Sequence, residues 1–118
     1  MEHPLKGVWS VEARSSGRPN VDRATHAYHD DGVLTIAGTN YSAQGIWSAL
    51  GPSTVAVAAL LPTPPGEGLD GWFELKGRPE LSPDGSTFQL DGTISRPTPS
   101  GTPIERTVTT SGRRMVLP

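Results

Sequence analysis

The chain has 118 residues and a mass of 12.5 kDa, which suits one domain rather than two. Ten Lys and Arg residues stand against 12 Asp and Glu residues; this net charge of −2 argues against nucleic acid as a partner, and the absence of cysteine excludes disulfides and thiolate sites. No apolar run approaches the roughly 20 residues of a membrane span, and Met1–Lys6 shows no export pattern, so we expect a cytoplasmic protein without membrane contact.

Short segments of alternating apolar and polar residues, separated by Gly- and Pro-rich turns, predict an all-β protein. The eight predicted strands are Gly7–Ala13, Arg23–His29, Val33–Ala37, Ser42–Leu50, Thr54–Leu61, Gly71–Leu81, Ser86–Ser95 and Ile104 to about Leu117. We expect Pro79 to interrupt the sixth strand, because proline has no N–H for pairing. We expect Gly112 to bend the last strand.

One apolar face per strand predicts an antiparallel sheet with a single buried side. Closure into an eight-stranded up-and-down barrel would leave no exposed sheet edge. We therefore predict a single barrel domain over residues 1–118, with residues 1–6 as a flexible N-terminal segment. The inward face of the strand over 42–50 is predicted to carry Ala43 and Trp47, although the opposite face carries Ile46 and Leu50.

Loop lengths distinguish the two ends of the predicted barrel. Three connections, Asp30–Gly32, Gly51–Pro52 and Ser82–Gly85, are tight, whereas the connections 14–22, 62–70 and 97–103 are long. Alternate connections of an up-and-down barrel share an end, so the long loops are predicted to gather at one open end. A barrel of about eight strands has room for its own side chains or for one small ligand.

Two separated motifs resemble the calycin, or lipocalin-like, pattern. Gly7-Val8-Trp9 opens the first strand, and Arg113 and Arg114 lie in the last. In that family a Gly-x-Trp opens strand one, and an arginine from the end of the barrel packs over the tryptophan. The resemblance therefore implies a lipocalin-like barrel in which one of the two arginines lies on Trp9, where a cation is attracted to the aromatic face.

The middle of the chain is similar to small bacterial lipocalin-like proteins. The matching residues are Tyr28-His29-Asp30-Asp31-Gly32, Gly45-Ile46-Trp47 and Gly51-Pro52. An allene-oxide-cyclase-like barrel is a second eight-stranded fold that the chain resembles. That second resemblance implies a relation to cyclases of natural-product pathways.

The candidate site lies in the barrel interior, where small inward residues leave space toward the open end. His26 and Tyr28 share a strand face and are candidate catalytic acid/base or hydrogen-bonding residues. The alternative for His26 is a core histidine bonded to Tyr28 or to a backbone carbonyl. The candidate ligand-binding residues are Val11, Ala24, Ile36, Tyr41, Trp47, Leu61, Phe73, Ile94 and Arg106.

Other chemistries lack their motifs. His26 and His29 are three residues apart and point to opposite faces of a strand, so no metal site is expected. Ser48 and Ser53 lack a Gly-x-Ser-x-Gly elbow. No G-x-G-x-x-G or G-K-[ST] motif is present, and we expect no cofactor.

The sequence favours a protein that binds a small, mainly apolar molecule through the end bordered by the long loops. One alternative is a cofactor-independent cyclase or isomerase of a natural-product pathway, which would fold its substrate and use one acid/base or hydrogen-bonding residue. Another is a structural module with a filled core that forms a homodimer through the face of Trp72. The residues leave open the ligand, the oligomeric state and the choice between carrier and catalyst.

Overall fold

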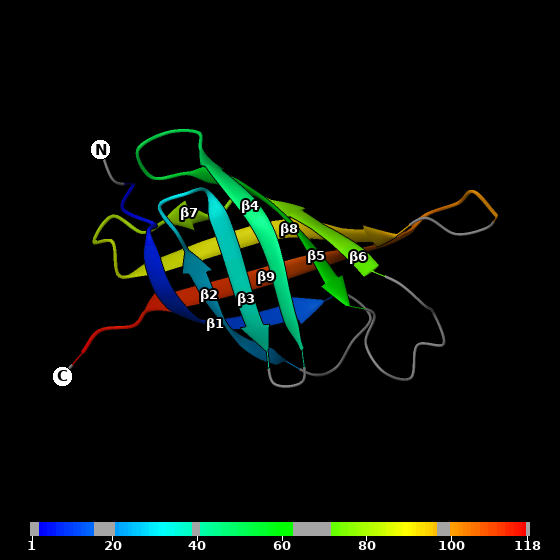
Figure 1. Cartoon of the computed structure of the whole chain (residues 1–118), viewed down its shortest axis with the longest axis horizontal. Coiled ribbons are helices and arrows are strands. Elements are labelled where there is room, and N and C mark those ends of the chain that lie inside the picture. Colours follow the sequence, from blue (N-terminus) through cyan, green and yellow to red (C-terminus); the bar gives the residue numbers. More distant parts are fainter. Residues whose placement is uncertain (1–2, 16–20, 39–40, 63–71, 97–99, 118) are drawn as a thin grey trace.

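The computed structural model describes residues 3–15, 21–38, 41–62, 72–96 and 100–117, and the secondary structure within these ranges is strand and turn (Figure 1). The strands are β1 (Gly7–Ser15), β2 (Asp22–Tyr28), β3 (Val33–Gly38), β4 (Ser42–Ala49), β5 (Val55–Pro62), β6 (Trp72–Gly77), β7 (Glu80–Leu81), β8 (Thr87–Arg96) and β9 (Ile104–Arg114). The predicted strand pattern is confirmed, with one predicted strand divided into β6 and β7. β9 keeps its pairing through Gly112, where a bend was predicted, and ends at Arg114 rather than near Leu117.

The sheet closes on itself as an up-and-down barrel. Neighbours pair in the order β6-β5-β4-β3-β2-β1-β9-β8, and β6 also pairs with β8, where Leu75 lies opposite Ile94. Every pairing is antiparallel, and the two-residue strand β7 extends the pairing of β8. This arrangement is the predicted eight-stranded antiparallel barrel, and its closure removes the long edges of an open sheet. The described ranges contain no helix with the length and apolar character that a membrane crossing needs.

Pro79 divides the sixth predicted strand in two, as its missing N–H predicted. The residue is buried, and its carbonyl accepts a hydrogen bond from the Val55 N–H at 3.2 Å. The chain then resumes pairing at Glu80, which also bridges to Thr54. The interruption therefore keeps β7 attached to both β8 and the start of β5.

The inner faces of the strands carry the apolar positions that the alternation predicted. In β4 the structure buries Ala43 and leaves Ile46 65% exposed, which confirms the predicted inward face of that strand. The buried apolar side chains form one cluster inside the barrel: Leu5, Trp9, Val11, Tyr28, Leu34, Ile36, Ala43, Val55, Val57, Ala59, Phe73, Leu75, Phe88, Leu90, Ile94 and Val108. Removing this surface from water is the main favourable contribution to folding.

The two ends of the barrel differ in their connections. The tight turns β2–β3, β4–β5 and β7–β8 lie at the end that also holds both termini of the barrel (Figure 1). The C-terminal ends of β1, β5 and β8, from which the three long connections leave, lie at the opposite end. The long connections themselves fall partly outside the described residues, at 16–20, 63–71 and 97–99.

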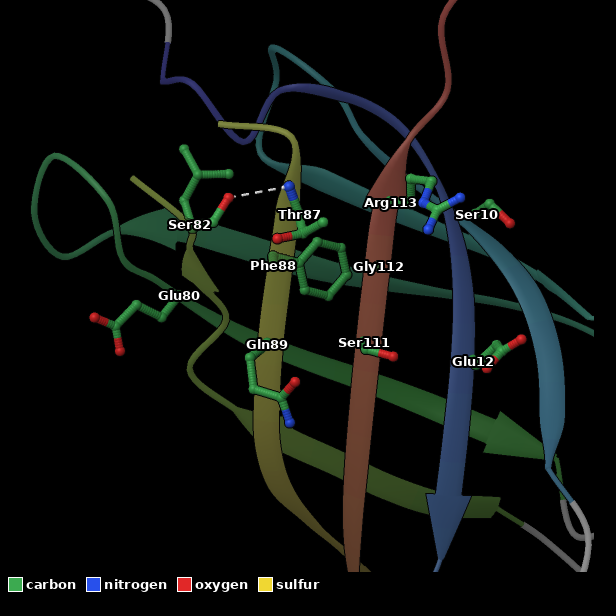
Figure 2. Close-up of a pocket in the computed structure, with 11 residues that line it drawn as sticks. Ser10, Glu12, Glu80, Ser82, Thr87, Phe88, Gln89, Ser111, Gly112 and Arg113 are labelled. Atoms are coloured by element: carbon green, nitrogen blue, oxygen red, sulfur yellow. Dashed lines mark hydrogen bonds between the residues drawn. The ribbon is translucent and has the colours of Figure 1, made fainter. Parts of the chain in front are cut away.

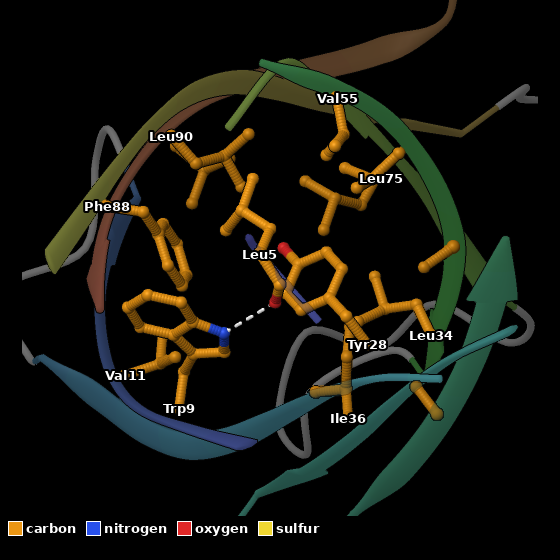
Figure 3. Close-up of a cluster of buried hydrophobic side chains, with 14 of the residues drawn as sticks. Leu5, Trp9, Val11, Tyr28, Leu34, Ile36, Val55, Leu75, Phe88 and Leu90 are labelled. Carbon is orange, nitrogen blue, oxygen red and sulfur yellow. Dashed lines mark hydrogen bonds between the residues drawn. The ribbon is translucent and has the colours of Figure 1, made fainter. Parts of the chain in front are cut away.

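Residues 3–6 close one end of the barrel, which differs from the flexible segment expected over residues 1–6. Leu5 is fully buried in the core cluster, and its carbonyl accepts the indole N–H of Trp9 at 2.9 Å (Figure 3). Burial of Leu5 outweighs the freedom of a short chain end, because a Leu side chain gains about 1.5–3 kcal/mol when it leaves water. Residues 1–2 lie outside the described ranges.

Polar contacts hold this closing segment against the neighbouring turns. The His3 Nε2–H donates to the Gly51 carbonyl at 2.8 Å, and His3 Nδ1 accepts the Leu5 N–H at 3.1 Å. Lys6 Nζ lies 2.7 Å from a carboxylate oxygen of Asp30 in the β2–β3 turn. The segment is therefore tied to two of the three tight turns at the closed end.

Arg114 is the arginine that packs on Trp9. Its guanidinium carbon lies 4.3 Å from the centre of the Trp9 ring system, whereas Arg113 is exposed. The N–H groups of Arg114 donate to backbone carbonyls of Pro4, Lys6 and Gly85. The contact lies beside Gly7, whose φ of +126° is one that side chains rarely adopt. The cation–aromatic contact that the resemblance implied is therefore present, and it lies at the closed end.

Candidate functional site

β2 directs two ionisable side chains into the barrel. His26 and Tyr28 are 6% and 2% exposed, and both lie on the inner face of the strand because they are two residues apart. His26 lies opposite Trp9 on β1 and Ile36 on β3, while Tyr28 lies nearer the closed end. The structure thus brings the two predicted catalytic candidates together inside the barrel.

Aromatic rings lie against both members of this pair. The His26 ring is stacked with Phe88 at a centroid distance of 6.3 Å and an interplanar angle of 27°. Tyr28 meets Phe88 and Trp47 edge to face, at 6.2 Å and 5.7 Å. Figure 3 shows the Tyr28 ring reaching toward the middle of the barrel, with Phe88 and Trp9 on one side. The surroundings of both polar groups are therefore largely apolar.

Two polar atoms in this region have no hydrogen-bond partner within the described part of the chain. They are His26 Nδ1 and the Tyr28 hydroxyl oxygen, and both are fully covered by other atoms. Neither atom takes part in a hydrogen bond there, so hydrogen bonding through these atoms does not explain why His26 and Tyr28 are buried. An unpaired buried polar group costs about 1–3 kcal/mol, and such groups are uncommon in native proteins.

Burial keeps both groups uncharged at neutral pH. It lowers the pKa of His26 to about 4, because the imidazolium would lose its hydration. It raises the pKa of Tyr28, because the phenolate would also lose its hydration. His26 is therefore a neutral imidazole, and Tyr28 is a phenol.

The predicted ligand-binding residues other than Trp47 also face the interior. Val11, Ile36, Phe73 and Ile94 are buried, whereas Ala24, Tyr41, Leu61 and Arg106 are half-buried toward the open end. The guanidinium carbon of Arg106 lies 5.6 Å from the centre of the Phe73 ring. Burial, and to a smaller extent the charge of Asp22, raises the pKa of Tyr41. The open end therefore contains a positively charged side chain, that of Arg106, whereas His26 and Tyr28 in the deep interior are uncharged.

Trp47 has a different position from the others. Its indole N–H donates to the His29 carbonyl at 3.0 Å in the β2–β3 turn, and its ring meets His3 of the closing segment at 6.0 Å. Trp47 therefore lies at the closed end and shares only the Tyr28 contact with the site.

The sequence candidates did not include Phe88 and Leu5, two interior residues that shape the site and the closed end. Phe88 contacts Trp9, His26 and Tyr28 and is the aromatic centre of the site. Its inward position follows from the alternation in β8, which was available from the sequence. Leu5 had no such signal, because it precedes the first strand.

The described residues do not assemble a metal site. No group of three or more His, Asp or Glu side chains comes together among them. His29 points outside the barrel, where its Nε2 is 2.9 Å from the Thr35 hydroxyl. The two histidines of β2 and its turn therefore lie on opposite sides of the wall, as their spacing predicted.

Hollows on the outer surface of the described barrel wall include two grooves, one of which is lined in part by Phe88 and Gly112. A groove of about 630 Å³ lies over β7, β8, β9 and β1 and is lined mainly by exposed polar side chains, among them Glu12, Gln89 and Ser111 (Figure 2). A smaller groove of about 360 Å³ lies over β3, β4 and β5, with Gln44 and Leu60 in its lining. Neither groove contains a candidate ligand-binding residue.

Comparison with known proteins supports the fold. No protein-family model matches the chain. No curated protein matches it. Among solved structures, the fold is similar to that of EF1p2_mFAP2b bound to DFHBI, with a TM-score of 0.71, 95% of this chain and 94% of that chain covered, and 10% sequence identity. A closed antiparallel barrel of this kind fits the calycin-like resemblance.

Proposed function

We propose that this protein binds a small, mainly apolar molecule inside its barrel, and that the molecule enters between the long connections 14–22, 62–70 and 97–103. The observation that carries the proposal is the pair of unpaired polar atoms, His26 Nδ1 and the Tyr28 hydroxyl, in an apolar interior. A ligand with a polar group would pair these atoms and recover the free energy that their burial costs.

Side-chain size supports entry from the open end. Ala13, Ala24, Ala43 and Ala59 face inward on β1, β2, β4 and β5. Phe73 and Ile94, which are larger, face inward from β6 and β8. The similar fold of EF1p2_mFAP2b, solved with DFHBI bound, agrees with a binding role for such a barrel. At the closed end, by contrast, Leu5 and Trp9 occupy the interior.

Native mass spectrometry of the protein purified from the organism that encodes it tests the proposal. We expect one small molecule bound per chain. The Ala24→Leu variant, which fills the inner face near the open end, should lose it, whereas Ala37→Leu on the outer face should retain it. Equal retention by both variants would contradict binding in the interior.

A cyclase or isomerase of a natural-product pathway is the second proposal, since a barrel of the allene-oxide-cyclase-like kind would use the same interior. Proton transfer by His26 is unfavourable at neutral pH, because a pKa of about 4 makes the imidazole a weak base. Orientation of a flexible substrate is the route that the site supports better. Incubation of the co-purified compound with fresh protein distinguishes the roles, because a carrier returns the same compound and a catalyst returns an isomer.

A structural module with a filled core is the remaining alternative. Its expected dimer contact, the Trp72 face, lies outside the side chains that the structure describes. Failure of the interior to bind any small apolar probe would favour this alternative over both others.

A further inference from the structure

We propose that the ligand carries an uncharged hydrogen-bonding group, a hydroxyl, phenol or carbonyl, which enters first and pairs with His26 and Tyr28. This inference rests on the proposed function and names the chemical class of ligand. It excludes molecules that would place a carboxylate or an ammonium group in the deep interior.

β2 presents the side chains of His26 and Tyr28 on the same inner face, and the proposal places one neutral ligand group between their two unpaired atoms. The α-carbons of residues two apart on a strand are separated by about 6.6 Å, and both side chains extend from the same face. The Tyr28 phenol can both donate and accept a hydrogen bond, whereas each nitrogen of the neutral His26 imidazole either donates or accepts one. A ligand hydroxyl can therefore accept from one partner and donate to the other, and a carbonyl can accept from both.

The surroundings of His26 and Tyr28 disfavour a charged ligand group. The buried polar or charged residues of the described structure are His26 and Thr110, so no carboxylate, ammonium or guanidinium group is buried there. Moving an ion into such surroundings without a counter-charge is costly, whereas a neutral group with partners is not.

The two inward-reaching arginines do not change this conclusion. Arg114 lies on the Trp9 ring at the closed end, where its N–H groups donate to backbone carbonyls of the closing segment and of the β7–β8 turn. Arg106 lies over Phe73 toward the open end.

Access to the pair requires some movement of the interior. His26 Nδ1 and the Tyr28 hydroxyl are fully covered by neighbouring atoms, so the ligand must displace neighbouring side chains to reach them. We therefore expect the binding affinity to depend on the polar group of the ligand as well as on its apolar contacts. Only the polar group recovers the free energy that the two unpaired atoms cost when they are buried.

Equilibrium dialysis at pH 7.5 with three probes, 2-naphthol, naphthalene and 2-naphthoate, tests the inference. These probes share a ring system and differ in carrying a neutral hydroxyl, no polar group or a carboxylate. We expect 2-naphthol to bind about tenfold more tightly than either other probe. Tyr28→Phe and His26→Phe should each reduce this preference, and both variants should fold, because each removes an unpaired buried polar atom. His29→Phe, outside the barrel wall, is the matched control and should keep the preference.

The outcomes separate this inference from the proposed function. Equal binding of 2-naphthol and naphthalene would overturn the inference and leave a binding interior intact. A hydroxyl preference that survives both inner-face substitutions, or tightest binding of 2-naphthoate, would also overturn it. Failure of all three probes to bind would contradict the proposed function itself.

Discussion

The ring of Phe88 lies against the backbone of Gly112 on the neighbouring strand β9. The two residues are cross-strand partners, and a β-carbon at position 112 would overlap the ring. This close approach lets Phe88 reach Trp9, His26 and Tyr28 at the same time. Gly112 is therefore needed for the packing of the aromatic site.

Gly112→Ala should lower the free energy of unfolding by about 1–3 kcal/mol, because the added methyl group displaces the Phe88 ring. Urea unfolding measures the loss. The double variant Gly112→Ala/Phe88→Leu should lose less than the sum of the single changes, since the smaller side chain relieves the overlap. Gly51→Ala is the control, because a β-carbon there meets no atom within 4 Å.

Arg114→Ala should destabilise the protein by about 1–2 kcal/mol. The substitution removes the cation from the Trp9 ring and the hydrogen bonds to carbonyls of the closing segment. Arg113→Ala, at an exposed position, should change the midpoint of urea unfolding little. An equal effect of the two substitutions would show that the contact on Trp9 contributes no stability.

Leu5→Ala should cost about 2–5 kcal/mol of the free energy of unfolding, the range for truncation of a fully buried leucine. Thermal or urea unfolding gives the value. Leu117→Ala, at a side chain that is 93% exposed, is the matched control and should have no measurable effect. A neutral Leu5→Ala would mean that residues 3–6 do not close the barrel in solution.

Stability should fall as the pH drops from 6.5 toward 4, because of His26. The unfolded chain takes up the proton near pH 6.5, whereas burial lowers the pKa in the folded state to about 4. The contribution is complete above pH 6.5 and is lost as the pH approaches 4, by on the order of 3 kcal/mol in total. Asp84 acts at lower pH, because hydrogen bonds from Ser86 and Ser82 lower its carboxyl pKa to about 2.

The measurement for this pH dependence is urea unfolding of the wild type and His26→Phe in parallel between pH 7.5 and pH 4. The wild type should lose stability relative to the variant over this interval. A constant difference between the two proteins at all pH values would mean that His26 titrates alike in the folded and unfolded states.

The fold could be predicted from the sequence in those segments where apolar and polar side chains alternate. The period of two placed Phe73, Phe88 and Ile94 on inner faces, and it also resolved β4, whose two faces are both partly apolar. Pro79 fixed the break in the sixth strand through its missing N–H. These are local properties, so the sequence carries them without knowledge of the closed barrel.

The closed end was less predictable because it depends on contacts far apart in the chain. Leu5 has no strand pattern of its own, and its burial depends on a completed barrel beside it. The choice of Arg114 over Arg113 depends on the register of β9 against β1, in which Trp9 lies opposite Arg114. The unpaired state of His26 Nδ1 likewise depends on which atoms the other strands bring to it.

Methyl-resolved NMR of the protein during titration with 2-naphthol tests interior binding most directly. We predict shifts for inward methyl groups of Val11, Ile36 and Ile94, with contacts from the probe to the same groups. The outward methyl groups of Val8, Ile46 and Leu60 provide the comparison within the same spectrum and should remain unshifted. Shifts confined to these outward groups would contradict a binding site inside the barrel.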